Sequence, residues 1–389
     1  MKKSKIPHLL LLLAAILLCS CASKKPSTES TAFPTDTSPD QTTTPTSNSV
    51  ETEEPTPPSD PPDDSVPPQE GMKRSRLTNE WVSEEVADTR PIAVMTPNEI
   101  SAIPHYNLSQ ASVLYEANVE GRMTRMLAVY ENWWELERIG NVRSLRSYYD
   151  DWATEWDAVL LHYGATIYDD EFLSLPTTQD LDGNAYDGIN DEDDAYFRAT
   201  DRSAPHNGYA YGPGILNDFK KRGYSLTDRG LADETHYQFT NEDEPNTLEQ
   251  YDDAVSGTVV DMSGCYPVTR CRFEYNEEDG LYYRYQRLSG GSDGPHVDAV
   301  TGEQLTFTNI LIQNMDYGIA SETYLYFVTL DTTQDGWFFT KGRGIHVTWE
   351  KTTQYGATRY YDDDGNEITL NTGKTMVLIV EDGDVFNYE

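Results

Sequence analysis

The stretch MLAVYENWWELERIGNVRSLRSYYDDWATEWDAVLLH, residues 126–162, decides the fold class that the sequence predicts. It begins and ends with continuous apolar runs, 126–130 and 158–162, and such runs are typical of strands that are buried on both faces. Between them lies a helical segment through Trp152 and Trp156. Strand, helix and strand in this order predict an α/β layered domain.

The rest of the folded sequence divides into two regions of different character. Two further apolar runs, 91–95 and 112–116, predict more buried strands in the first region. From about residue 258 onward, strand-like runs alternate with turn signals that are typical of β-hairpins, such as Asp279-Gly280 and Asp364-Gly365. We therefore predict an α+β or α/β fold with an N-terminal α/β layered domain, 78–245, and an antiparallel β-rich C-terminal domain, 246–389. The boundary is expected within the acidic segment 241–253.

The N-terminus resembles a lipoprotein signal. Residues 1–20 combine three lysines with an apolar run, as an export signal does. The run ends in Leu18-Cys19-Ser20-Cys21, which resembles a bacterial lipobox with Cys21 as the lipidated residue; an ordinary secretory signal with a chance cysteine is the alternative. Residues 21–77 are rich in proline, serine and threonine and predict a disordered stalk. Two or more acyl chains anchor a protein stably, so we expect it on the extracytoplasmic face of the cell membrane.

The charge balance excludes some partners. The chain has 66 acidic and 29 basic residues and a net charge of −37, which becomes −40 when three lysines leave with the signal. Such a chain repels nucleic acid over long range, so we expect no nucleic-acid partner. The sequence contains no P-loop, GxSxG, HExxH or CxxC motif, and we expect no cofactor.

Two arginines, Arg143 and Arg146, stand where a loop leads into the helical segment. The start of a helix favours anions, so these cations oppose the local dipole. One interpretation is that both guanidinium groups hold a bound phosphate, pyrophosphate or carboxylate. The other is internal ion pairing, in which neighbouring acids neutralise the arginines: Asp150, Asp151, Glu155 or Asp157. Ser144 or Ser147 is expected to cap the helix.

Further candidates lie at junctions between loops and strands. Arg125 begins a strand shortly after Glu116 and Glu120, and His162 ends one. In an α/β sheet such positions can converge on a crevice, where His162 would be a general base or, alternatively, a hydrogen-bonded structural residue. The loop DRSAPHNGY, residues 201–209, adds three polar candidates for ligand binding: Arg202, His206 and Asn207.

Three weaker patterns leave alternatives open. Cys265 and Cys271 are a disulfide candidate or, alternatively, two buried free thiols. Spacing in the segment 180–184 resembles part of a calcium loop, but the glycine comes too early and no glutamate stands at position twelve, so the pattern favours a solvated acidic loop. The candidate calcium ligands are Asp180, Asp182 and Asn184. Paired tyrosines in predicted strands, as in 282–285 and 360–361, indicate cross-strand packing or contact with sugar rings.

Several ordered motifs resemble the YerB-like lipoprotein family. They are RPIAVM at 90–95, ASVLYEANVEGRMTRMLAVYE at 111–131, IGNVRSLRSYYDDWATEWDAVLLHYG at 139–164, DRSAPHNGY at 201–209, GIHVTWEK at 344–351 and YYDDDGNEITLNTGKT at 360–375. The resemblance covers nearly all of 90–389. Because the domains of this family have no known function, the resemblance implies a fold and a location but no chemistry.

The function that these patterns favour is binding. We expect a membrane-anchored extracytoplasmic lipoprotein that binds an anionic or cell-envelope ligand, such as cell-wall glycan or a phosphorylated wall precursor, through an arginine-bearing crevice of its N-terminal domain. Two alternatives remain. One is an enzyme acting on envelope polymers, a glycan or phosphoryl transferase or a hydrolase. The other is a protein–protein accessory module with an envelope protein as its partner.

Overall fold

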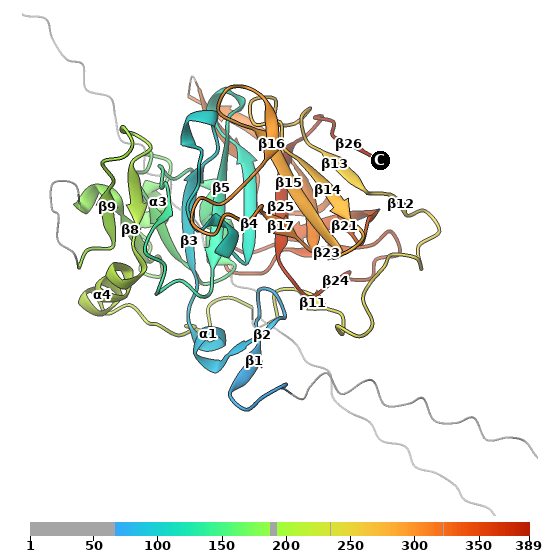
Figure 1. The fold of residues 1–389 in the computed structure, drawn as a ribbon, viewed down its shortest axis with the longest axis horizontal. Helices are drawn as coiled ribbons and strands as arrows, with labels where there is room; N and C mark the ends of the chain where they lie inside the picture. The colour runs from blue at the N-terminus through green and yellow to red at the C-terminus, as the bar shows by residue number, and fades with distance from the viewer. Residues whose placement is uncertain (1–66, 187–192, 234, 322) are drawn as a thin grey trace, which may run out of the picture. The chain divides into compact units, whose positions relative to one another are not determined.

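The computed structural model describes residues 67–186, 193–233, 235–321 and 323–389, which belong to one compact unit, Asp60–Glu389 (Figure 1). The predicted export signal, the lipidation residue Cys21 and most of the predicted stalk lie outside the described residues. The stalk prediction is wrong at its C-terminal end, because strand β1 (Met72–Arg74) pairs with β2 (Trp81–Ser83) and Leu77 is buried. Among the described helices, none has the length and apolar character needed to cross a bilayer.

An eleven-stranded mixed sheet forms the centre of this unit. Strand β25 (Thr375–Glu381) lies inside it and pairs in parallel with both β18 (Asn309–Met315) and β4 (Val113–Asn118). The strands from β18 outward are β21 (Asp331–Thr340), β22 (Arg343–Lys351) and β12 (Val255–Ser256), with β23 (Arg359–Tyr361) also on β22. The strands from β4 outward are β5 (Thr124–Tyr130), β3 (Ile92–Pro97), β7 (Val159–His162) and β8 (Asp180–Asp182).

The four strands predicted from continuous apolar runs are confirmed as β3, β4, β5 and β7. Every residue of these strands is buried, because both faces of the sheet are covered. Alternate side chains enter two different cores: Val94 and Leu161 lie in one, and Ala93 and Leu160 lie in the other.

A six-stranded antiparallel sheet contributes to the first of these cores through Phe273 and Tyr282. Its predicted hairpin turn at Asp279-Gly280 is confirmed, and Gly280 adopts the positive φ of 75° that the turn requires. The six strands are β13 (Val259–Asp261), β14 (Arg272–Asn276), β15 (Leu281–Arg287), β16 (Asp293–Pro295), β17 (Thr306–Phe307) and β26 (Asn387–Tyr388). Smaller sheets comprise β6 (Ile139–Gly140), β9 (Tyr196–Arg198) and β10 (Gly208–Ala210); β11 (Gln238–Phe239) and β24 (Thr369–Leu370); and β19 (Tyr317–Ala320) and β20 (Tyr324–Phe327).

The fold is mostly β, so the prediction of an α/β layered N-terminal domain holds only in part. The predicted helix is α2 (Tyr148–Thr154), which covers one face of the sheet through Tyr149 and Trp152. It has only seven residues, because the chain turns inward after Thr154 and buries Glu155 and Trp156. The other described helices are α1 (Glu84–Asp88), α3 (Asp170–Leu173) and α4 (Gly212–Arg222), with short 3-10 turns η1 (Ile100–Ala102), η2 (Leu108–Gln110), η3 (Glu120–Arg122) and η4 (Gly183–Tyr186).

The two halves of the sequence share the central sheet. Figure 1 shows β25, from the C-terminal half, next to β4, from the N-terminal half. The acidic segment in which we expected the boundary lies against the C-terminal half, since Leu248 is buried and the Asn246 amide donates to the carbonyl of Thr369 at 2.8 Å. No break between sheets therefore coincides with the predicted boundary in the part of the chain that the structure describes.

Candidate functional site

The candidate site lies at the end of the central sheet where β3 and β7 finish and β5 begins. Arg125 at the start of β5 lies opposite Pro97 at the end of β3, and His162 ends β7, which runs parallel to β3. The register therefore brings two of the predicted site residues to one end of the sheet, as the rule for loop–strand junctions led us to expect.

Backbone hydrogen bonds fix the loop that carries the two arginines across this end of the sheet. The amide of Arg143 donates to the carbonyl of Met95 at 2.9 Å, and its own carbonyl accepts from the amide of Tyr163 at 3.0 Å. The amide of Leu145 donates to the carbonyl of Gly164 at 2.9 Å. The loop is thus tied to the ends of β3 and β7 before its side chains are considered.

Arg146 is neutralised internally, but not by the acids that we had predicted. Its guanidinium donates to both carboxylate oxygens of Glu120, with Nη2 to Oε2 at 2.7 Å and Nε to Oε1 at 2.9 Å. Burial opposes ionisation of Glu120, but the hydrogen bond and charge of Arg146 outweigh it and lower the pKa of Glu120. The carboxylate comes from the turn before β5, which no local spacing around Arg146 indicates.

The four acids predicted to neutralise the arginines have other roles, so that prediction is wrong. Asp151 accepts a hydrogen bond from the Thr329 hydroxyl. Glu155 pairs with Lys351 at 3.3 Å, and Asp157 pairs with Arg90 at 3.3 Å and also with Arg229. Asp150 is buried, and neither of its carboxylate oxygens has a hydrogen-bond partner among the described residues. The predicted cap is also absent: Ser147 occupies the N-cap position of α2, but its hydroxyl lies 3.1 Å from that of Tyr324 and does not cap the helix.

Arg125 and Arg143 remain without a carboxylate partner within 4 Å among the described residues. Arg125 is buried, and its guanidinium donates to the carbonyl of Ser144. Burial, together with the nearby charges of Arg146 and Arg143, lowers the pKa of Arg125 to about 10. Arg143 is half-buried. The site therefore holds two cations that no described carboxylate pairs with directly, and the carboxylate charge that acts on Arg125 is that of Glu120, which is already paired with Arg146.

The other buried arginines differ in this respect. Arg284 pairs with Glu116 at 2.7 Å, and both side chains are fully buried. Arg90 pairs with Asp157. Buried charges in proteins are normally paired in this way, because an unpaired charge keeps its full cost of desolvation. The arrangement at Arg125 is the exception among the three buried arginines that the structure describes.

Glu116 and His162, two further candidates from the sequence, make their hydrogen bonds to groups other than Arg143. Besides Arg284, Glu116 accepts from the amide of Asn98 at 2.7 Å and from the hydroxyl of Thr124 at 2.6 Å. His162 donates through Nδ1 to the carbonyl of Gly164 at 3.0 Å, and its Nε2 lies 3.2 Å from the Asp180 carboxylate. Burial lowers the pKa of His162, but the bond to Asp180 outweighs it, and the net shift is upward. The geometry supports the structural interpretation of His162.

The loop 201–209 is built around its own polar residues. Arg202 donates to four backbone carbonyls of the segment 101–104, among them Ser101 at 2.7 Å. His206 lies 3.3 Å from Glu99, and burial and the charge of Arg143 lower its pKa. Asn207 donates to the carbonyl of Ala199 at 3.2 Å. These contacts hold the loop beside Arg143 and leave Arg202 and Asn207 in structural roles.

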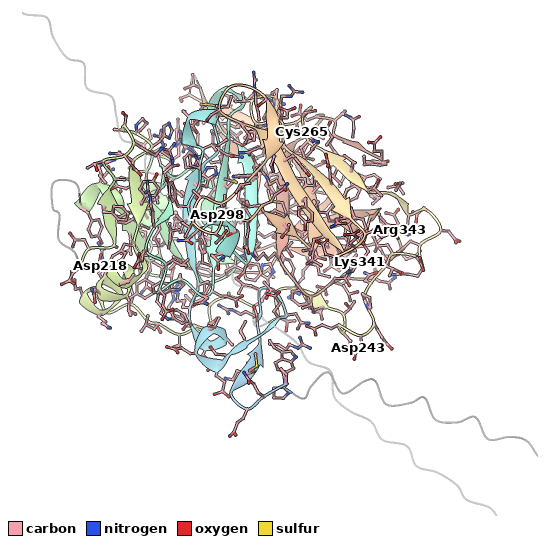
Figure 2. All side chains as sticks on the ribbon, viewed as in Figure 1. Asp218, Asp243, Cys265, Asp298, Lys341 and Arg343 are labelled. Carbon is pink, nitrogen blue, oxygen red and sulfur yellow. The ribbon has the colours of Figure 1, made fainter. Side chains whose placement is uncertain are left out.

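The disulfide prediction is wrong in this structure. Cys265 and Cys271 are both buried free thiols, and Figure 2 marks Cys265 near the six-stranded sheet. The two thiols face different groups: Cys271 lies 3.9 Å from the Glu116 carboxylate, whereas Cys265 lies beside Asp384 and Arg122. Burial raises the pKa of Cys265 to about 12, so this thiol is unreactive.

The calcium candidates are also engaged within the chain. Asp180 contacts His162, and the carboxylate of Asp182 accepts from the amides of Gly164 at 2.8 Å and Asn184 at 2.9 Å. Within the described ranges of the chain, no group of three or more acidic, histidine or cysteine side chains is placed to hold a metal ion.

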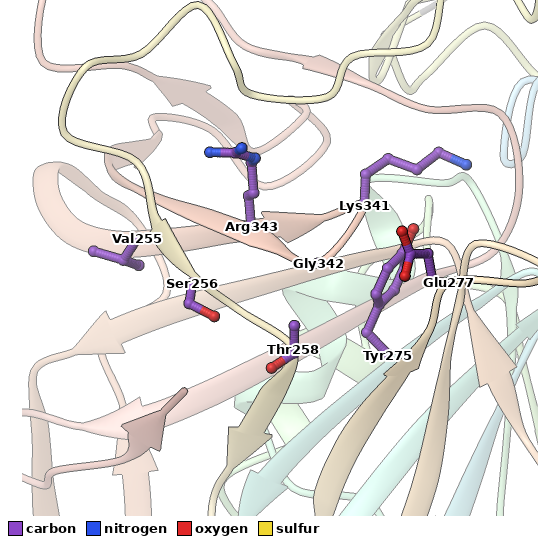
Figure 3. A pocket seen from close by; sticks show the side chains of 8 residues that line it. All are labelled: Val255, Ser256, Thr258, Tyr275, Glu277, Lys341, Gly342 and Arg343. Atoms are coloured by element: carbon purple, nitrogen blue, oxygen red, sulfur yellow. The ribbon is translucent and has the colours of Figure 1, made fainter.

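An open cleft of about 520 Å³ lies in the C-terminal half, and none of the residues that line it is a predicted site candidate (Figure 3). Its lining includes the exposed cation Arg343 and also Lys341, from the turn between β21 and β22; Figure 3 shows Tyr275 and Glu277 on the side of the cleft toward which Lys341 extends. Sequence reasoning also missed Arg284 as the partner of Glu116. Because 168 residues separate them, no short motif links the pair.

Comparisons with known proteins agree with the resemblance seen in the motifs. Two family models match the chain: "Protein of unknown function (DUF3048) N-terminal domain" over residues 77–225, and the corresponding C-terminal domain over residues 262–377. A Bacillus subtilis (strain 168) protein named "Putative lipoprotein YerB" is 26% identical over 321 residues, which cover 82% of this chain and 89% of that protein. The crystal structure of YerB protein from Bacillus subtilis matches with a TM-score of 0.68 at 23% identity, over 82% of this chain and 99% of that chain, which shows a shared fold.

Proposed function

The chain belongs to the DUF3048 family, whose function is unknown. From its own residues we propose that it is a lipid-anchored extracytoplasmic protein that binds an anionic ligand. The ligand would contact Arg125 and Arg143, with Arg146 beside them.

The observation that carries this proposal is the missing carboxylate. The chain has 66 acidic residues for 29 basic ones, so a cation in it has many available partners. Arg90, Arg284 and Arg146 each have one, yet buried Arg125 and neighbouring Arg143 do not. Holding like charges together costs stability, and proteins commonly accept such a cost at binding sites. A bound anion would supply the missing charge through charge-assisted hydrogen bonds.

The chemistry of the site favours phosphate, pyrophosphate or a carboxylate, because guanidinium groups recognise planar or tetrahedral oxyanions through paired N–H donors. The location is supported by the lipobox-like sequence that ends at Cys21 and by the name of the Bacillus subtilis relative. Outside the membrane, phosphorylated wall precursors and anionic wall polymers carry such groups.

The binding test uses the full chain with inorganic pyrophosphate as the probe. An anion that binds only the folded state raises its stability, by about 2.7 kcal/mol at a concentration of 100 times Kd. We expect pyrophosphate to raise the Tm of the wild type but not that of Arg143→Glu. Arg270→Glu is the matched control, because Arg270 is 47% exposed and lies in the C-terminal half, 3.6 Å from Asp293. Equal stabilisation of wild type and Arg143→Glu, or none of the wild type, would refute the proposal.

The anchor is tested separately by fractionation of cells that express the full chain. Cys21→Ala should move the protein from the membrane fraction to the soluble fraction, because the acyl chains that hold it can no longer be attached. If the variant stays in the membrane fraction, Cys21 is not the anchor.

A further inference from the structure

A second cleft, of about 380 Å³, lies beside the arginine loop and is lined mainly by aromatic side chains. Three separate segments build it: the start of α2, the loop before α3 and the hairpin of β19 and β20. This volume falls within the range of small-molecule sites, roughly 300–1,000 Å³. The lining residues are Ser147, Tyr148, Asp151, Tyr168, Ala320, Tyr324, Tyr326, Phe327 and Thr329.

The aromatic walls are held in place by specific contacts. Tyr168 stacks on Tyr324 with ring centroids 4.2 Å apart. The hydroxyl of Tyr324 accepts from the amide of Ser147 at 3.0 Å, which fixes its ring against α2. Tyr148 packs edge-to-face on Phe327 with centroids 5.0 Å apart. The cleft is therefore preformed and does not depend on a ligand to assemble it.

Tyr326 lies flat across its own hairpin because residue 318 is glycine. A Cβ atom at Gly318 would come within 2.4 Å of the Tyr326 hydroxyl oxygen. The side chain of Tyr326 is 40% exposed, and that of Tyr168 is 37% exposed. Two ring surfaces from different segments thus remain open to solvent at one cleft. By contrast, Tyr282 and Tyr360, which lie in the strands predicted for sugar contact, are buried and serve cross-strand packing.

The polar groups of the cleft are hydroxyls and one carboxylate. Asp151 accepts from Thr329, and Ser147 lies beside Tyr324. Arg146 borders the cleft, with its guanidinium carbon 5.8 Å from the centre of the Tyr324 ring, but Glu120 already neutralises it. The charge of Lys351 acts on Asp151, although Lys351 does not line the cleft. Aromatic faces with acceptor and hydroxyl groups between them suit a ligand that combines apolar C–H faces with hydroxyls, and do not suit an anion.

We propose that this cleft binds a sugar ring of a neutral oligosaccharide, which stacks on Tyr168 and Tyr326 and donates hydroxyl hydrogen bonds to Asp151. The C–H face of a pyranose is attracted by the negative face of an aromatic ring, and the few fixed polar groups orient it. The inference extends the proposed function, since a wall polymer carries sugars and anionic groups on one chain. It does not require the arginines to bind an anion.

The test measures binding of two neutral tetrasaccharides, one of β-1,4-linked N-acetylglucosamine and one of β-1,4-linked glucose, to the full chain by isothermal titration calorimetry. Wild type should bind at least one of them. Tyr168→Ala and Tyr326→Ala should each weaken binding at least tenfold, because each removes one of the two ring faces on which the sugar stacks. Asp151→Asn should weaken it because a charged acceptor is lost.

Tyr317→Ala is the matched control, because Tyr317 belongs to the same hairpin, is 45% exposed and does not line the cleft. No binding of either tetrasaccharide by wild type, or an equal loss in Tyr317→Ala, would overturn the inference. Pyrophosphate stabilisation measured on Tyr326→Ala separates the two sites: it should persist if the arginines bind an anion, whatever the outcome for the sugar.

Discussion

Replacing Arg125 by methionine tests whether the buried charge of this arginine lowers the stability of the folded state. Methionine is an unbranched, adaptable side chain that fills most of the space of the arginine stem without its charge. Arg284→Met is the matched comparison, because Arg284 is also buried but is paired with Glu116 at 2.7 Å. Both substitutions delete one guanidinium from the core, and only the second leaves a carboxylate without its partner.

The structure sets opposite expectations for the two variants. A pKa lowered from 12.5 to about 10 means that folding disfavours the charged form of Arg125 by roughly 3 kcal/mol. Methionine removes this penalty and loses one charged hydrogen bond to Ser144, worth about 1.5–3 kcal/mol. Arg125→Met should therefore be between neutral and about 2 kcal/mol more stable than wild type. Arg284→Met should lose about 3–5 kcal/mol, as breaking a buried ion pair usually does.

Urea unfolding of the full chain, followed by tryptophan fluorescence, measures both changes through the unfolding midpoint. The wild type, Arg125→Met and Arg284→Met are compared at pH 7 in one buffer without phosphate. A loss of more than about 1 kcal/mol in Arg125→Met would refute the reasoning, because Arg125 would then be a structural cation. Stability gained together with loss of pyrophosphate binding is the expected combination for a residue kept for binding.

Three further outcomes follow from buried groups elsewhere. Burial, reinforced by neighbouring acids, raises the pKa of Asp150 well above its ordinary value. Ionisation of Asp150 therefore lowers the stability of the fold as pH rises above about 4. Asp150→Asn should raise the urea midpoint at pH 7, and a gain that does not shrink toward pH 4 would contradict this. Burial raises the pKa of Glu155, but the charges of Lys351 and His236 outweigh it and hold it at about 2. The contribution of the Glu155 carboxylate to the free energy of unfolding is therefore fully present above about pH 4.5 and is lost as pH falls through 2. Glu155→Gln should lower the free energy of unfolding by about 3 kcal/mol at pH 7 and by clearly less at pH 3. Iodoacetamide should label Cys265 and Cys271 only after the protein is denatured, and this labelling should need no reductant; peptide mass spectrometry measures it. Labelling that requires a reductant would show a disulfide.

The sequence was sufficient to predict those features that depend on local pattern. Four strands buried on both faces were recognised because their apolar runs do not alternate, and the hairpin at Asp279-Gly280 was recognised because its turn requires a positive φ at one position. The convergence of Arg125 and His162 at one end of the sheet followed from their places at strand ends.

Features that depend on distant pairing could not be predicted. The insertion of β25 between β18 and β4 leaves no trace in local periodicity. Spacing along the chain favours nearby acids as partners of Arg146, but its partner is Glu120, 26 residues away in the sequence. The two meet because the turn before β5 and the arginine loop lie at the same end of the sheet. The aromatic cleft joins Tyr168 to Tyr324, and only the fold shows that these two segments lie together.

The position of β25 has a consequence for the order in which the chain acquires its structure. Synthesis and export both proceed from the N-terminus, so residues 92–162 are available to fold before residues 375–381, and β4 has no partner on one of its edges until β25 arrives. Such an edge invites wrong pairing, and contacts this distant in sequence close slowly. Chains that stop short of residue 375 should therefore be aggregation-prone, because β25 is the strand that covers the open edge of β4.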